Sequence, residues 1–128
     1  MTKKDILKYW LKVAKEDLET AETLIKAGKY HHCLFFCHLA LEKIIKGLVY
    51  KNTNNHPFPI HNLKKLATQA KLNVASQQVK EMGEMTSWNI EARYDNIKRE
   101  FYKKATKAFT IKWLQKTKDL FLWLKNQY

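Results

Sequence analysis

The sequence predicts an all-α fold, a bundle of five antiparallel helices of which four are long and one is short. Three observations support it. The chain has only 3 Gly and 2 Pro in 128 residues, too few turn residues for a β-rich fold. Apolar residues recur at helical spacing along most of its length. Hydrophobic residues make up 45% of the chain, and its length is that of one ordinary domain, so we expect a single domain spanning residues 1–128.

The first predicted helix runs from Lys3 to Ala27 and is followed by Gly28, a residue that suits the end of a helix. Its apolar residues form one stripe: Ile6, Trp10, Val13, Ala14, Leu18, Ala21, Leu24 and Ile25. Asp17 lies on the core-facing side of this stripe. Burying a carboxylate alone is prohibitive, so Asp17 has either a buried partner or an edge position open to solvent.

The central helix is predicted from His31 to Lys51 and is the most apolar stretch of the chain. The short turn before it makes it an antiparallel neighbour of the first helix. It carries one narrow polar strip, formed by Glu42, Lys43 and Lys46, and these charges exclude a membrane span. The strip is either the wall of an anion site or, the reading we favour, a solvated rim with an i,i+4 pair between Glu42 and Lys46.

Charge and cysteine content restrict the class of protein. The net charge of +12 suggests an anionic partner such as a nucleotide or nucleic acid. However, only Arg93 and Arg99 are arginine, so the lysines could instead reflect codon usage. Cys33 and Cys37 share one helix face, which suits buried free thiols in a reducing compartment better than a disulfide. Without a signal peptide, metal-ligand spacing or cofactor motif, we expect a cytoplasmic protein with no metal and no cofactor.

The second half of the chain is predicted to contain three more helices. A loop with two prolines leads to a short helix that Asn62 caps. The connector before the last helix contains no Gly or Pro. The predicted segments are the loop 52–61, the short helix Leu63–Ala70, a helix from Asn73 or Ser76 to about Asn89, the connector 90–100 and the last helix Tyr102–Asn126.

Four segments in this order resemble motifs of HEPN domains. The first is Trp10, Ala14, Asp17-Leu18 and Ala21; the second is Cys37-His38-Leu39-Ala40-Leu41-Glu42-Lys43-Ile44-Ile45-Lys46, similar to a Gln-Ala-x-Glu-Lys-x-x-Lys helix. The third is Pro59-Ile60-His61-Asn62-Leu63, similar to a His-Asp-Leu turn, and the fourth is Ala92-Arg93-Tyr94-Asp95, similar to Ala/Ser-Arg-Tyr-Pro-Asp. The resemblance implies a five-helix bundle that dimerises, and kinship with the C-terminal domain of kanamycin-type nucleotidyltransferases.

The resemblance also implies functions. Small HEPN proteins are often encoded beside a minimal nucleotidyltransferase, and some such pairs act as toxin and antitoxin. Catalytic members are metal-independent ribonucleases that use an Arg followed four to six residues later by a His. Here no histidine follows Arg93 up to Glu100, so the catalytic motif is incomplete. Glu42 or His38 would have to serve as a displaced base, since such a reaction needs one.

The candidate site combines an anion-binding part and a polar cleft. An Arg fork beside an aromatic ring can hold a phosphate and stack a base, whereas the alternative is a structural Arg paired with a carboxylate. For His61 at the start of the short helix, the reading we favour is capping or packing. The candidate nucleotide- or phosphate-binding residues are Arg93, Tyr94, Lys43 and Lys46, and those of the polar cleft are Asp17, Glu42 and His61.

Our principal functional hypothesis is a non-catalytic HEPN protein, the homodimeric partner of a minimal nucleotidyltransferase, with a nucleotide- or RNA-binding cleft. The alternatives are a ribonuclease with a displaced base and a generic basic bundle that contacts RNA only through its lysines. Trp123 and Tyr128 fall off the apolar stripe of the last helix, so we expect them to face a partner.

Overall fold

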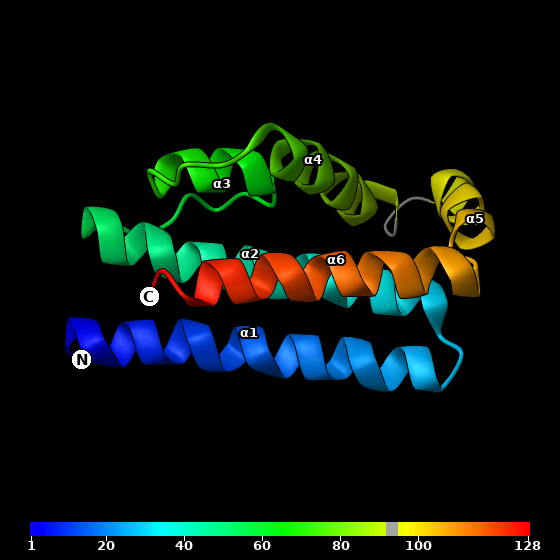
Figure 1. The fold of residues 1–128 in the computed structure, drawn as a ribbon, viewed down its shortest axis with the longest axis horizontal. Coiled ribbons are helices and arrows are strands. Elements are labelled where there is room, and N and C mark those ends of the chain that lie inside the picture. The colour runs from blue at the N-terminus through cyan, green and yellow to red at the C-terminus, as the bar shows by residue number, and fades with distance from the viewer. Residues whose placement is uncertain (92–94) are drawn as a thin grey trace.

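The computed structural model describes the backbone of residues 1–91 and 95–128 and the side chains of residues 1–89 and 99–128. Over these ranges the chain forms six α-helices and no strand (Figure 1). Their bounds are α1 Lys3–Lys26, α2 Tyr30–Thr53, α3 Leu63–Gln69, α4 Ser76–Glu91, α5 Asp95–Lys104 and α6 Lys107–Lys125. The all-α prediction is confirmed, and the count of five helices is one too low.

Helix α2 is the centre of the bundle. It contacts α1, α3, α4, α5 and α6, and 12 of its 24 residues are buried. In Figure 1, α1 lies below α2, α6 passes in front of it, and α3 and α4 lie above it. Helix α1 is antiparallel to α2, but α6 runs in the same direction as α2. The bundle is therefore not antiparallel throughout, because α3, α4 and α5 carry the chain back to the end where α2 begins.

The α1–α2 turn follows from the sequence around Gly28. The glycine adopts φ +75°, in the left-handed region that favours glycine. Its N–H donates to the carbonyl of Ile25 at 3.1 Å, and the N–H of Lys29 donates to that of Leu24 at 2.8 Å. This pair of bonds is a Schellman motif, which satisfies the last carbonyls of α1 and reverses the chain. The predicted helix end at Gly28 is confirmed.

The segment after α4 departs from the prediction. The connector expected over residues 90–100 contains the first part of α5, and the last helix begins at Lys107 instead of Tyr102. The break between α5 and α6 is made by Thr106, whose Oγ1 accepts a hydrogen bond from the N–H of Phe109 at 3.2 Å. Threonine at this position satisfies a free N–H of the new helix, so the chain turns without Gly or Pro.

The start of α3 is as predicted. Asn62 caps the helix through a hydrogen bond from the N–H of Lys65 to its Oδ1 at 3.0 Å. Leu63 and Leu66 of α3 are fully buried. Asn62 therefore fixes the position at which the chain leaves the loop and enters the bundle, and this position places His61 beside α2.

The C-terminal residue packs inside the bundle. The hydroxyl of Tyr128 donates to the carbonyl of Ile44 at 2.8 Å, next to Gly47 of α2. Burial raises the pKa of this hydroxyl. Trp123 is half-buried against the core. The polar atom of Tyr128 already has an acceptor within the chain, and a contact of its ring with a partner stays a prediction.

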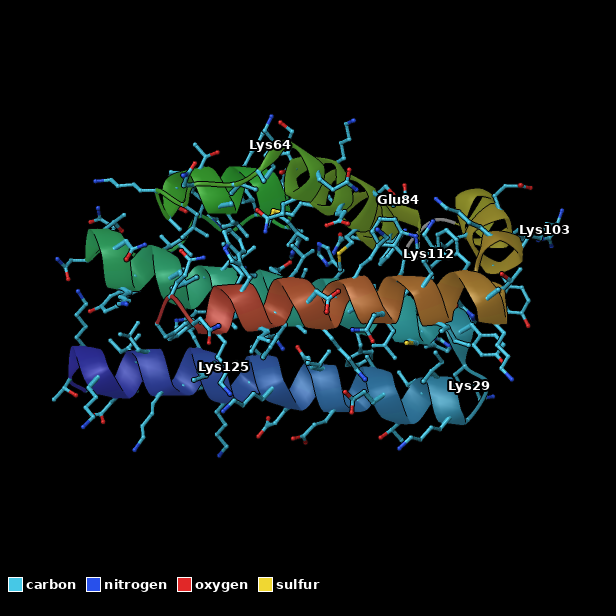
Figure 2. The ribbon with its side chains drawn as sticks, viewed as in Figure 1. Lys29, Lys64, Glu84, Lys103, Lys112 and Lys125 are labelled. Carbon is cyan, nitrogen blue, oxygen red and sulfur yellow. The ribbon has the colours of Figure 1, made fainter. Side chains whose placement is uncertain are left out.

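Charged side chains cover the outer faces of the helices, as Lys29, Lys64, Lys103 and Lys125 illustrate in Figure 2. Within the described residues, none of the helices combines the length and the apolar character that a membrane span requires.

Candidate functional site

Asp17 of α1 is paired with Lys43 of α2. The Lys43 Nζ lies 2.6 Å from the Asp17 Oδ2, and the side chains are 30% and 13% exposed, respectively. Their attraction is that of two opposite charges at close range. The sequence required a partner or a solvent-exposed edge for Asp17; the structure provides the partner.

Glu42 is the centre of a second, more buried arrangement. The residue is only 5% exposed. Its Oε2 accepts a hydrogen bond from the Nζ of Lys46 at 3.1 Å, and its Oε1 accepts one from the Nδ1–H of His61 at 2.8 Å. The i,i+4 pair predicted for Glu42 and Lys46 is confirmed, but the solvated rim is wrong, because Glu42 is buried. Both carboxylate oxygens are satisfied by groups that bear, or can bear, positive charge.

His38, one helical turn before Glu42, extends this arrangement inward. It is fully buried, and its Nε2–H donates to the backbone carbonyl of His61 at 2.8 Å. The Nδ1 atom is then the unprotonated nitrogen, and it has no hydrogen-bond partner among the described residues. Burial lowers the pKa of His38, although the His61 carbonyl and the Glu42 charge oppose this shift. His38 is therefore a neutral donor that holds the turn against α2.

We call His38, Glu42, Lys46 and His61 the polar cluster. His61 is held twice, through its backbone carbonyl and through its imidazole. The next part of the turn is tied to α4, because the N–H of Leu63 donates to the Oγ1 of Thr86 at 3.1 Å. The His61 side chain nevertheless remains 45% exposed. Its Nε2 makes no hydrogen bond with a described residue, so the cluster presents one oriented imidazole nitrogen at the surface.

The structure thus brings together several of the predicted site residues, whereas two others do not belong to the described residues. Glu42, Lys46 and His61 form one hydrogen-bonded unit, and Asp17 and Lys43 form a separate ion pair. Arg93 and Tyr94 lie outside the described residues. Neither Glu42 nor Asp17 needs an arginine, because lysine or histidine already pairs with each.

Sequence reasoning named His38 only as a possible displaced base and did not place it in the polar cleft. The signal that could have identified it is its position four residues before Glu42, which places both side chains on one face of α2. No local pattern in the sequence indicates that the Nε2–H of His38 bonds to a backbone carbonyl of the loop, that of His61.

The polar cluster can carry out proton transfer or anion binding. A histidine whose Nδ1–H is fixed by a carboxylate has its Nε2 available as a proton acceptor, and the imidazolium that forms is stabilised by the same carboxylate. Lys46 and Lys43 each have a carboxylate within 3.1 and 2.6 Å, respectively, which offsets much of their attraction for a phosphate. In the described part of the chain, no group of three or more His, Cys, Asp or Glu side chains is arranged to hold a metal ion.

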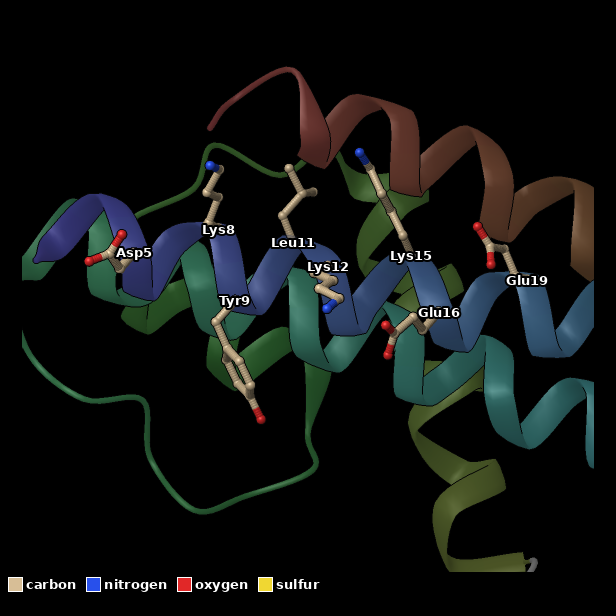
Figure 3. Close-up of a pocket in the computed structure, with 8 residues that line it drawn as sticks. All are labelled: Asp5, Lys8, Tyr9, Leu11, Lys12, Lys15, Glu16 and Glu19. Carbon is tan, nitrogen blue, oxygen red and sulfur yellow. The ribbon is translucent and has the colours of Figure 1, made fainter. Parts of the chain in front are cut away.

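A broad hollow along α1 is a different feature and lacks such organisation. Figure 3 shows that the side chains lining it all come from α1. They include both carboxylates, such as Asp5 and Glu16, and lysines, such as Lys8 and Lys12. A trough on a single helix with both signs of charge is typical of a solvated face.

The two cysteines are buried free thiols, as predicted. The two thiols interact with each other, and Thr117 of α6 lies close to Cys37. The neighbouring Cys33 thiol, together with burial, raises the pKa of Cys37. Both thiols belong to the α2–α6 contact and lie outside the polar cluster.

One protein-family model covers almost the whole chain. The family model of the HEPN domain matches residues 7–127. The chain therefore belongs to the HEPN domain family, and the resemblance found in its motifs is confirmed. No curated protein and no solved structure matches it significantly.

Proposed function

We propose that this HEPN protein binds the phosphate groups of a nucleotide or of RNA at the polar cluster, together with Arg93 and Tyr94. The observation that carries the proposal is the buried Glu42, which orients Lys46 and the half-exposed His61 at one point of the surface. HEPN domains are in general connected with nucleotides or RNA, which agrees with this assignment.

In this proposal the arginine supplies the main anion contact. A guanidinium offers two parallel N–H groups to a phosphate, whereas the ammonium groups of Lys43 and Lys46 are already paired. Tyr94 would stack on a base, and His61 would donate a hydrogen bond to a phosphate oxygen when protonated. Lys43 and Asp17 mainly hold α1 against α2, and Lys46 mainly holds Glu42 in the polar cluster.

The proposal includes the biological setting that the family resemblance implies. We propose a cytoplasmic homodimer that associates with a minimal nucleotidyltransferase and acts as a component of a toxin–antitoxin pair. The binding role is preferred to a catalytic one because no histidine follows Arg93 before Glu100. The net charge of +12 supports an anionic ligand.

A second candidate function, a metal-independent ribonuclease with a displaced base, is favoured by one observation. The Glu42–His61 hydrogen bond at 2.8 Å is the arrangement that prepares an imidazole to remove a proton from a ribose hydroxyl. Of the bases considered, His38 and Glu42 are buried and only His61 is accessible. The displaced base would therefore be His61, with Glu42 as its positioning residue.

Binding and cleavage can be tested with the same labelled single-stranded RNA in the presence of a chelator. We expect Arg93→Lys to weaken binding about tenfold at every salt concentration, because one charge-assisted hydrogen bond worth about 1.5 kcal/mol is lost at constant charge. The control is Lys112→Ala on the exposed face of α6, which should lower the salt dependence and not the specificity.

Equal binding by wild type and Arg93→Lys at all salt concentrations would refute the arginine site and leave a generic basic bundle. RNA cleavage that is lost in His61→Gln, with circular dichroism unchanged, would establish the ribonuclease candidate in place of the binding role.

A further inference from the structure

Phe58 is a large apolar side chain that the fold holds out toward solvent. It is 54% exposed and stands between Pro57 and Pro59, whose rings restrict the backbone on both sides. The N–H of Phe58 donates to the Oε1 of Gln69 at 3.0 Å, and the Nε2 of Gln69 donates to the carbonyl of His56 at 3.2 Å. One side chain of α3 thus clamps the loop before and after Pro57.

A groove between this loop and α3 begins at the Phe58 ring. It is lined by Phe58 and Ile60 of the loop and by Lys64, Lys65 and Thr68 of α3. Both lysines are exposed, neither has an ion-pair partner among the described residues, and Figure 2 shows Lys64 on the outer side of α3. No carboxylate lines this groove. An aromatic ring beside two unpaired cations in a chain of net charge +12 calls for an anionic occupant with a flat apolar part.

We infer that Phe58, Lys64 and Lys65 form a base-stacking subsite for single-stranded RNA, next to the polar cluster. The inference rests on the proposed function, because it extends the phosphate site along the same strand. Ile60 of the groove directly precedes His61 of the cluster, so one nucleic-acid strand can contact both. A base stacks on the Phe58 ring while neighbouring phosphates meet the two lysines, the combination by which proteins bind single strands without reading sequence.

Two other occupants fit this groove less well. A second copy of the chain would bring the same lysines and the same excess of positive charge to the contact. A stable protein interface needs an apolar centre of several side chains. Phe58 is the one large, exposed hydrophobic residue in the described part of the chain near this groove. A single aromatic ring on a loop whose backbone is held by Gln69 suits a base, because little conformational entropy of the loop is lost when the base binds.

The test compares variants in anisotropy titrations with a labelled oligouridine strand. Phe58→Ala should weaken binding about 5- to 150-fold and leave the salt dependence unchanged, because it removes stacking and no charge. Phe58→Trp should restore binding. Lys64→Ala and Lys65→Ala should each lower the slope of log K against log salt by about 0.7.

The matched control is Tyr9→Ala. Tyr9 is also 54% exposed, but the hollow that it lines on α1 carries carboxylates such as Asp5 and Glu16 as well as lysines (Figure 3). Its removal should leave binding unchanged. Circular dichroism of each variant checks that the exposed substitution has not altered the fold.

The outcomes separate this inference from the proposed function. If Arg93→Lys weakens binding while Phe58→Ala matches wild type, the phosphate site stands and the stacking subsite is refuted. If neither variant differs from wild type, both fail. If Phe58→Ala weakens binding to a labelled acidic peptide of glutamate and leucine but not to oligouridine, the groove is a protein docking site and the RNA assignment is overturned.

Discussion

Replacing Glu42 by glutamine tests whether the polar cluster is a coupled, buried unit. The substitution keeps the shape of the side chain but removes the charge that Lys46 and His61 share. Because Glu42 is only 5% exposed, Glu42→Gln should destabilise the protein far more than the loss of a surface ion pair would.

The magnitude follows from the contacts. Breaking a fully buried ion pair by removing one partner costs about 3–5 kcal/mol. Here Lys46 is 13% exposed, so its ammonium can still reach water, and glutamine retains one acceptor for His61. A hydrogen bond to a charged group contributes about 1.5–3 kcal/mol. We therefore expect a loss of about 2 kcal/mol in the free energy of unfolding, which lowers Tm by about 6–10 °C for a chain of this size.

The assay is urea unfolding of the wild type, Glu42→Gln, Lys46→Gln and the double variant. The double-mutant cycle should give a coupling energy of about 1 kcal/mol or more between the two positions. The matched control is Glu100→Gln, since Glu100 and Lys103 form an exposed pair at 3.7 Å with side chains 78% and 76% exposed, respectively. It should cost less than about 0.5 kcal/mol. Equal effects of Glu42→Gln and Glu100→Gln, with unchanged m-values, would refute the buried cluster.

Two further predictions concern the packing of α2. Because burial lowers the pKa of His38, the unfolded chain binds its proton more readily; the stability from neutral His38 is present above pH about 6.5 and is lost as the pH falls. Urea midpoints at pH 7.5 and 5.5 should therefore differ less in His38→Gln than in wild type, and equal differences would contradict this role. Gly47→Ala should destabilise by about 1–3 kcal/mol, because the new Cβ would overlap the Tyr128 hydroxyl and lie 2.8 Å from the Cβ of Trp10. Gly83→Ala in α4, which meets no atom within 4 Å, should instead stabilise by up to about 1 kcal/mol in the same unfolding assay, and similar midpoints for the two variants would rule out the close contact.

The long helices could be predicted because their signals are local. Gly28 terminates α1 and Asn62 starts α3. The backbone freedom of the glycine and the side-chain oxygen of the asparagine are each sufficient to set that helix boundary. The division between α5 and α6 was missed for a different reason. Thr106 breaks the helix with a side-chain cap, and a threonine at helical spacing also fits an uninterrupted stripe. Periodicity alone cannot separate these two cases.

The candidate site was predicted only in part. The pair between Glu42 and Lys46 is four residues apart and could be read from one helix. The contacts of His61 join residues 19 and 23 positions apart in the sequence, through a loop whose path depends on two prolines and on Gln69. Such a contact depends on tertiary packing, which has no signature in local spacing. The burial of Glu42 likewise follows from how the turn before α3 covers α2.

The parallel arrangement of α2 and α6 has a consequence for synthesis on the ribosome. The chain is made from the N-terminus at about 5–20 residues per second, and domains begin to form while synthesis continues. The α1–α2 hairpin can close early, but α6, which supplies Thr117 beside Cys37, is made more than 60 residues after α2 has begun. During those seconds the two thiols lack the helix that covers them, so a nascent chain stalled before α6 should react with a thiol reagent that the finished protein excludes.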